Sequence, residues 1–227
     1  MRAEVLDHGF VELVNYSPAD ADLMVANAAR VSFNAWSEEF GKAESGLVNF
    51  LMRDHHGTPF EHNLFTWRVK APIFVFREWH RHRTASISEW SARYSQMEPE
   101  FYVPALEDVR SQVGKPGAYR FEALPEGPAE SWRRIIERRC QGAFEDYEFM
   151  LANGVAKEVA RVVLPVGTYS QMLWSVNARN LMGFLQLRNS SFAQLEIRRY
   201  AEAMEGIWAE VMPRTAEVFR EHGRVKP

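Results

Sequence analysis

The sequence has only one cysteine in 227 residues, so a disulfide bond within the chain is excluded and a reducing compartment is favoured. It also has no apolar run of the roughly 18 residues that a membrane-spanning helix needs. Positive charge is not in excess, because the formal net charge is -3, and this disfavours general binding to nucleic acid or to a membrane surface. Residues 1–14 contain Glu4, Asp7 and Glu12, so they lack the apolar centre of a signal peptide. These absences predict a soluble, cytoplasmic protein.

Hydrophobic residues make up 46% of the chain, which is enough for a substantial core in one domain spanning residues 1–227. Alternating and helical spacings of apolar residues occur in blocks, and this order favours an α+β fold with an antiparallel sheet and packed helices. Ser17 and Asn177 are expected to cap helices. The predicted strands are 3–6, 10–14, 64–69, 98–104 and 169–176; the predicted helices are 18–31, 37–53, 73–82, 128–153, 155–164, 177–188 and 192–212, and 107–125 is an irregular connector.

The most informative stretch is residues 81–93, which read RHRTASISEWSAR. Its three leading basic groups would repel one another, so they favour a nearby anion. In an extended segment Glu89, Ser91 and Arg93 would share one polar face, about 6.6 Å apart, while the intervening residues pack. A solvated edge strand is the alternative interpretation.

This order of residues resembles the signature of the flavin-dependent thymidylate synthases, Arg-His-Arg-x-x-Ser-x-Asn-Glu-x-Ser-x-Arg. Only Ser88 departs from it, where the family usually has Asn. The similarity extends from residues 11–14 to residues 196–198, which covers most of the chain. The resemblance implies an FAD-binding enzyme in which nucleotide and flavin contacts come from this segment. By this resemblance, the flavin dinucleotide is contacted by Arg81, His82 and Arg83. The uridylate is contacted by Ser91 and Arg93, and Glu89 contacts both ligands.

Two further segments carry the resemblance in the first half of the chain. Residues 55–62 read HHGTPFEH, and three histidines there invite a metal interpretation. The separation of six between His56 and His62 is not the i, i+4 spacing of a helical zinc site, so we predict no metal. By resemblance Thr58 contacts the flavin, and Gly57, where the family has an acid, implies a looser loop.

The predicted helix 73–82 ends in several cations, which end-capping by the helix dipole partly explains. By resemblance Glu78 and Arg81 flank the uridylate. The family usually has Gln at position 78, so Glu78 adds a negative charge that needs compensation beside an anionic nucleotide.

The predicted helix 177–188 contains the best evidence for a site from the residues themselves. Asn177, Leu181, Phe184 and Arg188 form one stripe, and an arginine that continues an apolar stripe needs an anionic or hydrogen-bonding partner if it is buried. Snorkelling of its long stem to solvent is the alternative. By resemblance Arg188 sits against the uracil ring.

The same resemblance assigns further contacts near this helix. It implies that Asn177 and Arg179 help to hold the flavin and that Arg161, in the motif VARVVLP, binds the nucleotide. Gly183 replaces a usual flavin-contacting Asn, and Phe192 replaces a usual His, so flavin affinity or folate access is expected to differ.

The predicted activity is C5-methylation of a uridylate, dUMP to dTMP, with methylenetetrahydrofolate as carbon donor and NADPH as the source of reducing equivalents. The FAD carries the redox chemistry, and hydride entering at C6 removes the need for a thiol nucleophile. Cys140 is accordingly expected to be structural. The resemblance also implies a homotetramer with shared active sites.

Two other functions are open from the sequence. A family offshoot that methylates UMP, as in nucleoside-antibiotic biosynthesis, is motivated by Ser88, Glu78, Gly183 and Phe192. A non-catalytic nucleotide-binding protein that has lost flavin is the alternative from another class.

Overall fold

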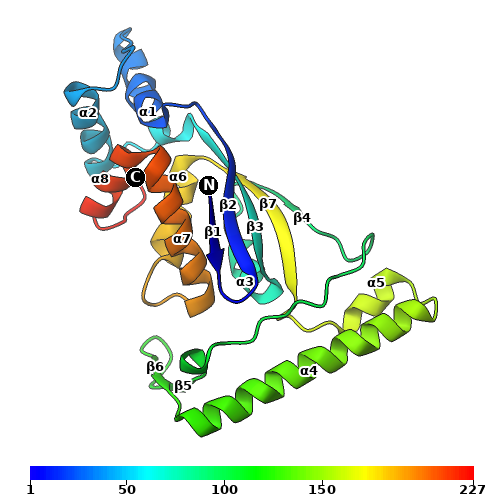
Figure 1. The fold of residues 1–227 in the computed structure, drawn as a ribbon. Helices are drawn as coiled ribbons and strands as arrows, with labels where there is room; N and C mark the ends of the chain where they lie inside the picture. Colours follow the sequence, from blue (N-terminus) through cyan, green and yellow to red (C-terminus); the bar gives the residue numbers. More distant parts are fainter.

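The computed structural model describes residues 1–227 and is built on one five-stranded sheet in the order β1-β2-β3-β7-β4. Every neighbouring pair is antiparallel, which confirms the predicted α+β class (Figure 1). The strands are β1 (Arg2–Val5), β2 (Gly9–Ser17), β3 (Leu64–Pro72), β4 (Ser86–Glu89) and β7 (Tyr169–Val176).

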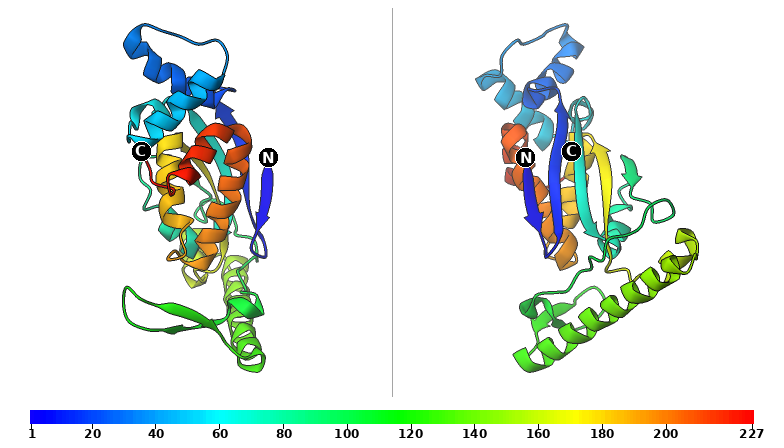
Figure 2. Two further views of the ribbon diagram at one scale, coloured as in Figure 1. Left: turned by 90° about the vertical axis from the view of Figure 1, so that its left-hand side faces the viewer. Right: turned by 45° about the vertical axis from the view of Figure 1, so that its right-hand side comes forward.

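Helices cover one face of this sheet, where Phe65, Trp67 and Val69 of β3 are fully buried. The opposite face leaves Leu64 and Leu173 exposed. The right-hand view of Figure 2 shows α6 and α7 behind the sheet, with α1 and α2 at one end. The helices of this body are α1 (Ala21–Arg30), α2 (Lys42–Arg53), α3 (Ile73–Trp79), α6 (Ala178–Arg188), α7 (Leu195–Val211) and α8 (Pro213–Glu221). No helix combines the length and apolar character that crossing a bilayer requires.

A long arm extends from this body (Figure 1). It comprises the hairpin β5 (Arg110–Val113) and β6 (Arg120–Ala123), the helix α4 (Glu126–Ala152) and the short α5 (Lys157–Ala160). The prediction of an irregular connector over 107–125 is therefore wrong, because antiparallel pairing forms a hairpin there. The residues of this hairpin show no strong apolar alternation, so their sequence does not mark them as strands. Four large apolar side chains of α4 stay exposed, namely Trp132, Ile135, Ile136 and Phe149.

Several predicted boundaries are also corrected. The first helix begins after Asp20, whose carboxylate accepts the Leu23 N–H at 2.9 Å, so Ser17 is not its cap. The second begins at Lys42 rather than at 37, because Glu44 accepts the Gly41 N–H at 3.0 Å and starts the helix there.

Other differences concern segments around the site. The predicted strand 98–104 is reduced to one bridge between Phe101 and Thr168. The helix predicted over 73–82 ends at Trp79, and that predicted over 155–164 is a four-residue helix followed by a 3-10 turn, Arg161–Val163. The last predicted helix starts later, at Leu195, and a further helix, α8, follows it.

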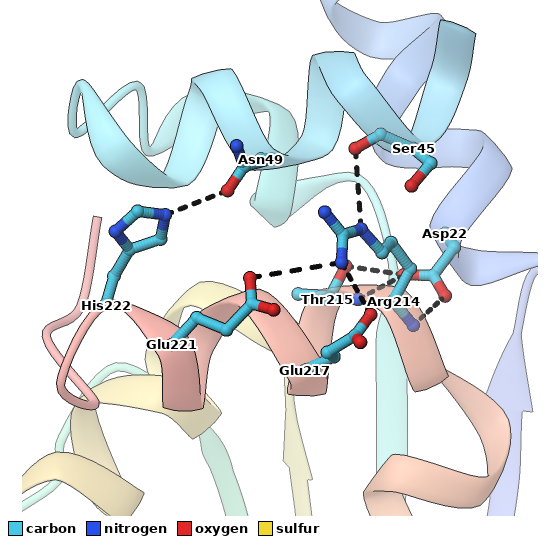
Figure 3. Close-up of polar contacts among 8 residues, drawn as sticks. All are labelled: Asp22, Ser45, Asn49, Arg214, Thr215, Glu217, Glu221 and His222. Atoms are coloured by element: carbon cyan, nitrogen blue, oxygen red, sulfur yellow. Dashed lines mark hydrogen bonds and ion pairs between the residues drawn. The ribbon is translucent and has the colours of Figure 1, made fainter. Parts of the chain in front are cut away.

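Helix α8 is anchored by a carboxylate from the other end of the chain. Asp22 of α1 accepts the backbone N–H groups of Arg214 and Thr215, both at 2.9 Å, and so satisfies donors that the helix start leaves free (Figure 3). Burial raises the pKa of the Asp22 carboxyl despite these bonds. Further bonds to α2 and within α8 involve Arg214 with Ser45, Glu217 and Glu221, and His222 with Asn49.

Candidate functional site

A cavity of about 480 Å³ lies between the residues that follow α3 and one side of α6. Its lining carries three basic side chains, Arg81, Arg83 and Lys226, together with His82, and includes no carboxylate. Leu187, which is 59% exposed, supplies the accessible apolar surface of the walls, with the buried Trp174 and Val176 beneath. The cavity therefore joins an apolar surface to a concentration of positive charge, which suits an anionic ligand with a flat ring.

Buried aromatic packing positions this cavity. Trp79, the last residue of α3, packs on Phe184 of α6 with ring centroids 4.6 Å apart, so the chain emerges beside α6 with Arg81 and its neighbours. At the start of α6 Asn177 accepts the Asn180 N–H at 2.9 Å, which confirms its predicted role as cap. Leu181 and Phe184 are fully buried, so they fix which face of α6 is turned towards the core. Arg188 lies one turn further along that face.

Arg188 is held by three hydrogen bonds. Its Nη1 donates to Glu78 Oε2 at 2.6 Å, its Nη2 to the Glu78 carbonyl at 3.0 Å, and its Nε to His82 Nε2 at 3.1 Å. The side chain is only 18% exposed, so the snorkelling alternative is wrong. A guanidinium has five N–H donors, and two of them remain free for another ligand.

Glu78 receives the compensation that its charge requires. The carboxylate pairs with Arg188, and the same residue's carbonyl accepts a second bond from that guanidinium. These two contacts hold the plane of the Arg188 guanidinium in a single orientation. Glu78, which stands where the family usually has Gln, is thus a charged partner for Arg188 of the predicted site.

His82 is uncharged at neutral pH. Burial, and then the nearby Arg188 and Lys226 cations, lower the pKa of His82 from 6.5 to about 4. Because Nε2 accepts the Arg188 bond, the ring proton resides on Nδ1. His82 therefore presents a neutral donor beside the cavity rather than a fourth positive charge.

Glu89 and Arg161 line a second, smaller cavity of about 260 Å³. Glu89 accepts a hydrogen bond from Ser170 Oγ at 3.0 Å, and its other oxygen lies 3.6 Å from His80 Nε2. Arg161, in the 3-10 turn after α5, is exposed. An acid on the sheet edge thus shares a concave surface with an arginine from the arm.

Ser91 and Arg93 do not extend the strand as predicted. Strand β4 ends at Glu89, and Ser91 begins a turn in which its carbonyl accepts the Tyr94 N–H at 3.0 Å. The backbone bonds to β7 continue only to the Trp90 N–H, which donates to the Gln171 carbonyl at 2.8 Å, so no such bond holds residues 91–95 in the sheet. Arg93 points out to solvent and lies over the Tyr94 ring.

Thr58 lines a third cavity, of about 780 Å³ and largely apolar, between α1, α2 and the 3-10 helix Thr58–Glu61. The neighbouring Gly57 is buried, and an added Cβ there would come within 2.2 Å of Arg179 Nε. Arg179 also donates to Glu61 at 2.6 Å and to the Pro227 carbonyl at 2.8 Å. Gly57 therefore gives close packing against Arg179, which is the opposite of the looser loop expected.

The donor set of the first cavity fits a flavin dinucleotide. Arg81 and Arg83 match the charge of a pyrophosphate, and Leu187, which is 59% exposed, offers apolar surface to a ring system. Cys140 offers no competing thiol chemistry, because it is buried and burial raises the pKa of its thiol. Lys226, Asn180, His80 and Ser170 also belong to these surfaces and were not predicted, since no local pattern marks them.

The fold and these surfaces define a protein that binds an anionic nucleotide or dinucleotide. The sequence profile of the family described as "Thymidylate synthase complementing protein" matches residues 12–214. Flavin-dependent thymidylate synthases from Tropheryma whipplei and Streptomyces avermitilis are 44% and 46% identical to the chain; each alignment covers 96% of it, and 94% and 93% of the respective relative. The chain belongs to the flavin-dependent thymidylate synthase family.

Solved structures agree with this placement. The similar structures include two crystal structures of the UMP/dUMP methylase PolB from Streptomyces cacaoi, one bound with 5-Br UMP and one with 5-Br dUMP. Each superposes on this chain with a TM-score of 0.88 at 43% identity. Each match covers 99% of this chain, together with 99% of the first structure and 100% of the second. The chain is accordingly an enzyme, a flavin-dependent methyltransferase that uses FAD to methylate dUMP at C5. The alternative of a non-catalytic nucleotide-binding protein is not supported.

Proposed function

We propose that the enzyme converts dUMP to dTMP with methylenetetrahydrofolate as carbon donor and NADPH as reductant, in the cytoplasm, and that the cavity between α3 and α6 holds the FAD. When bound and reduced, FAD supplies the hydride that a cysteine-free mechanism requires. The residues proposed to hold it, in addition to the cavity's Arg81, His82, Arg83 and Gly183, are Thr58, Glu89, Asn177 and Arg179.

The nucleotide would bind beside this cavity. Arg188 and Glu78 would face the uracil ring together with Arg81. Ser91, Arg93 and Arg161 would hold the phosphate and sugar, for which arginine's charge-assisted, bidentate bonds are suited. Glu89 would contact both ligands: it lines the second cavity and ends β4, the strand that follows the cavity-lining residues 81–84.

The observation that carries the proposal is the fixed orientation of Arg188. Glu78 and His82 use three of its five donors, so the two remaining N–H groups keep a constant direction. Donors that are oriented before the reaction stabilise negative charge as it develops on the pyrimidine N3 and carbonyl oxygens. The loss of one such group costs about 3 to 4 kcal/mol in the transition state.

A homotetramer with shared active sites would explain why the proposed residues occupy three surfaces of one chain. The exposed apolar side chains of α4 and of the open sheet face offer area for such assembly, notably Trp132, Phe149, Leu64 and Leu173. Partner subunits could then complete the phosphate side around Arg93 and Arg161.

The visible absorption spectrum of the purified protein is the first test of the proposal. A flavin band that bleaches with NADPH and returns when dUMP and methylenetetrahydrofolate are added together, with dTMP as product, is the expected result. A colourless protein that forms no dTMP even when FAD is added would contradict it.

UMP is the second candidate substrate, because the solved neighbour is a UMP/dUMP methylase that was crystallised with analogues of both nucleotides. The charged Glu78 beside Arg188 would face the uracil ring, which the two nucleotides share, so discrimination between them would fall to the residues that hold the sugar. Comparing kcat/KM for dUMP and UMP decides between them.

A further inference from the structure

The last residues of the chain return to the cavity between α3 and α6. Lys226 lines the cavity together with Arg81 and Arg83, and Pro227, which follows it, is buried. Two hydrogen bonds attach Lys226 to α6: its backbone N–H donates to Gln186 Oε1 and its Nζ to Asn180 Oδ1, both at 3.0 Å. The Pro227 carbonyl accepts from Arg179 at 2.8 Å.

Lys226 occupies space that only a glycine leaves open. A Cβ added at Gly183 would lie 2.9 Å from Lys226 Cδ and 3.6 Å from its Nζ, so a larger residue at 183 would displace this side chain. Position 183 is also where the family usually carries an Asn that contacts the flavin. The glycine and the lysine are therefore sterically coupled.

The charge of Lys226 is only partly balanced. Burial, and then the neighbouring Arg179 cation, lower the pKa of Lys226, and the Glu61 carboxylate, which acts in the opposite direction, offsets this only in part. Its hydrogen-bond partner Asn180 is uncharged, and no carboxylate lines the cavity. An ammonium group has three donors, of which Asn180 uses one. The two that remain are available to an anion.

We propose that Lys226 is a cofactor-binding residue that takes the place left by Gly183 and contributes its ammonium group to an anionic group of FAD. The inference rests on the proposal that this cavity is the flavin site. It assigns to the C-terminal segment a binding role that replaces the missing side chain at position 183.

Titration of apoprotein with FAD, followed by flavin fluorescence at several salt concentrations, tests this directly. Lys226→Ala is expected to raise the Kd for FAD about tenfold, as expected for one charge-assisted hydrogen bond, and to flatten its salt dependence. Lys226→Arg should restore most of the affinity. Lys115→Ala, in the β5–β6 turn, is the matched control and should leave the Kd unchanged.

The coupling with Gly183 gives the sharper measurement. Because an Asn at 183 would already displace the lysine, Lys226→Ala should weaken FAD binding by no more than about twofold in a Gly183→Asn background. An equal loss in both backgrounds, an unchanged Kd for Lys226→Ala, or tighter binding, which would mean that the segment competes with FAD, would overturn the inference.

A third variant separates this inference from the assignment of the cavity. If Arg81→Ala weakens FAD binding and Lys226→Ala does not, the role of Lys226 is wrong while the cavity remains the flavin site. If neither variant changes the Kd, FAD binds elsewhere and both proposals fail.

Discussion

The two sides of the proposed site differ in how completely one chain builds them. On the α3–α6 side, Arg188 is 18% exposed and three hydrogen bonds hold its guanidinium. On the side formed by β4 and the arm, Arg93 and Arg161 are exposed, and neither forms an ion pair with a carboxylate. The groups proposed to face the ring are oriented before any ligand arrives, whereas those proposed to face the phosphate still have conformational freedom to lose.

This contrast indicates a division of roles. A side chain that is already fixed can act in the transition state without reorganisation, and removing it should lower kcat. A flexible side chain that closes on a phosphate contributes mostly to binding, and removing it should raise KM. The following variants test the division, from the largest expected effect to the smallest.

Arg188→Ala should give the largest loss. We expect the protein to fold and retain FAD while kcat falls about 100- to 1000-fold, because the oriented donors for the pyrimidine are lost. Single-turnover dTMP formation measures the effect, and Arg2→Ala, an exposed arginine of β1, is the control. Near-normal turnover of Arg188→Ala would remove it from the mechanism.

Arg161→Ala and Arg93→Ala should each raise the KM for the nucleotide about tenfold with a smaller change in kcat, since each removes one charge-assisted contact to the phosphate or sugar. Steady-state kinetics with saturating folate and reductant separate the two constants. A fall in kcat as large as that of Arg188→Ala would show that the two sides are not divided in this way.

Stability should depend on pH through His82. Its folded-state pKa, about 4, is below the ordinary 6.5, so the unfolded chain binds the proton more strongly between these values. This contribution is fully present above pH 6.5 and is lost as the pH falls towards 4. After allowance for solvent access, we expect the free energy of unfolding to fall by on the order of 1 kcal/mol over this pH range because of His82. Urea unfolding of wild type and His82→Gln across this range measures it; parallel curves would contradict it.

Glu78→Gln should have the smallest effect. The amide can still accept a hydrogen bond from Arg188 but removes the charge pair, which in a partly exposed position contributes about 1 kcal/mol or less. We expect kcat/KM to change no more than about fivefold, and by a similar factor for dUMP and UMP, because the two nucleotides share the uracil ring that Glu78 would face. A changed ratio of UMP to dUMP turnover would show that Glu78 acts on the sugar rather than on the ring.

Parts of this arrangement could be predicted from short stretches of sequence. Alternation predicts a strand over 169–176, and β7 spans Tyr169–Val176. The stripe of Leu181, Phe184 and Arg188 predicts a buried face with a partnered arginine, which the structure confirms. Where side-chain spacing carries little apolar signal, as in the β5–β6 hairpin and the turn after Glu89, local patterns failed.

The sequence alone determined the class of fold, the family signature and the residue types of the site, because periodicity and motif order are local properties of a chain. Only the tertiary structure decided which of these residues meet. Glu78 and Arg188 are 110 positions apart, and their pairing depends on α3 and α6 packing together. The approach of Lys226 to Gly183 likewise depends on the folded path of the last residues, since no spacing in the chain encodes a contact between distant side chains.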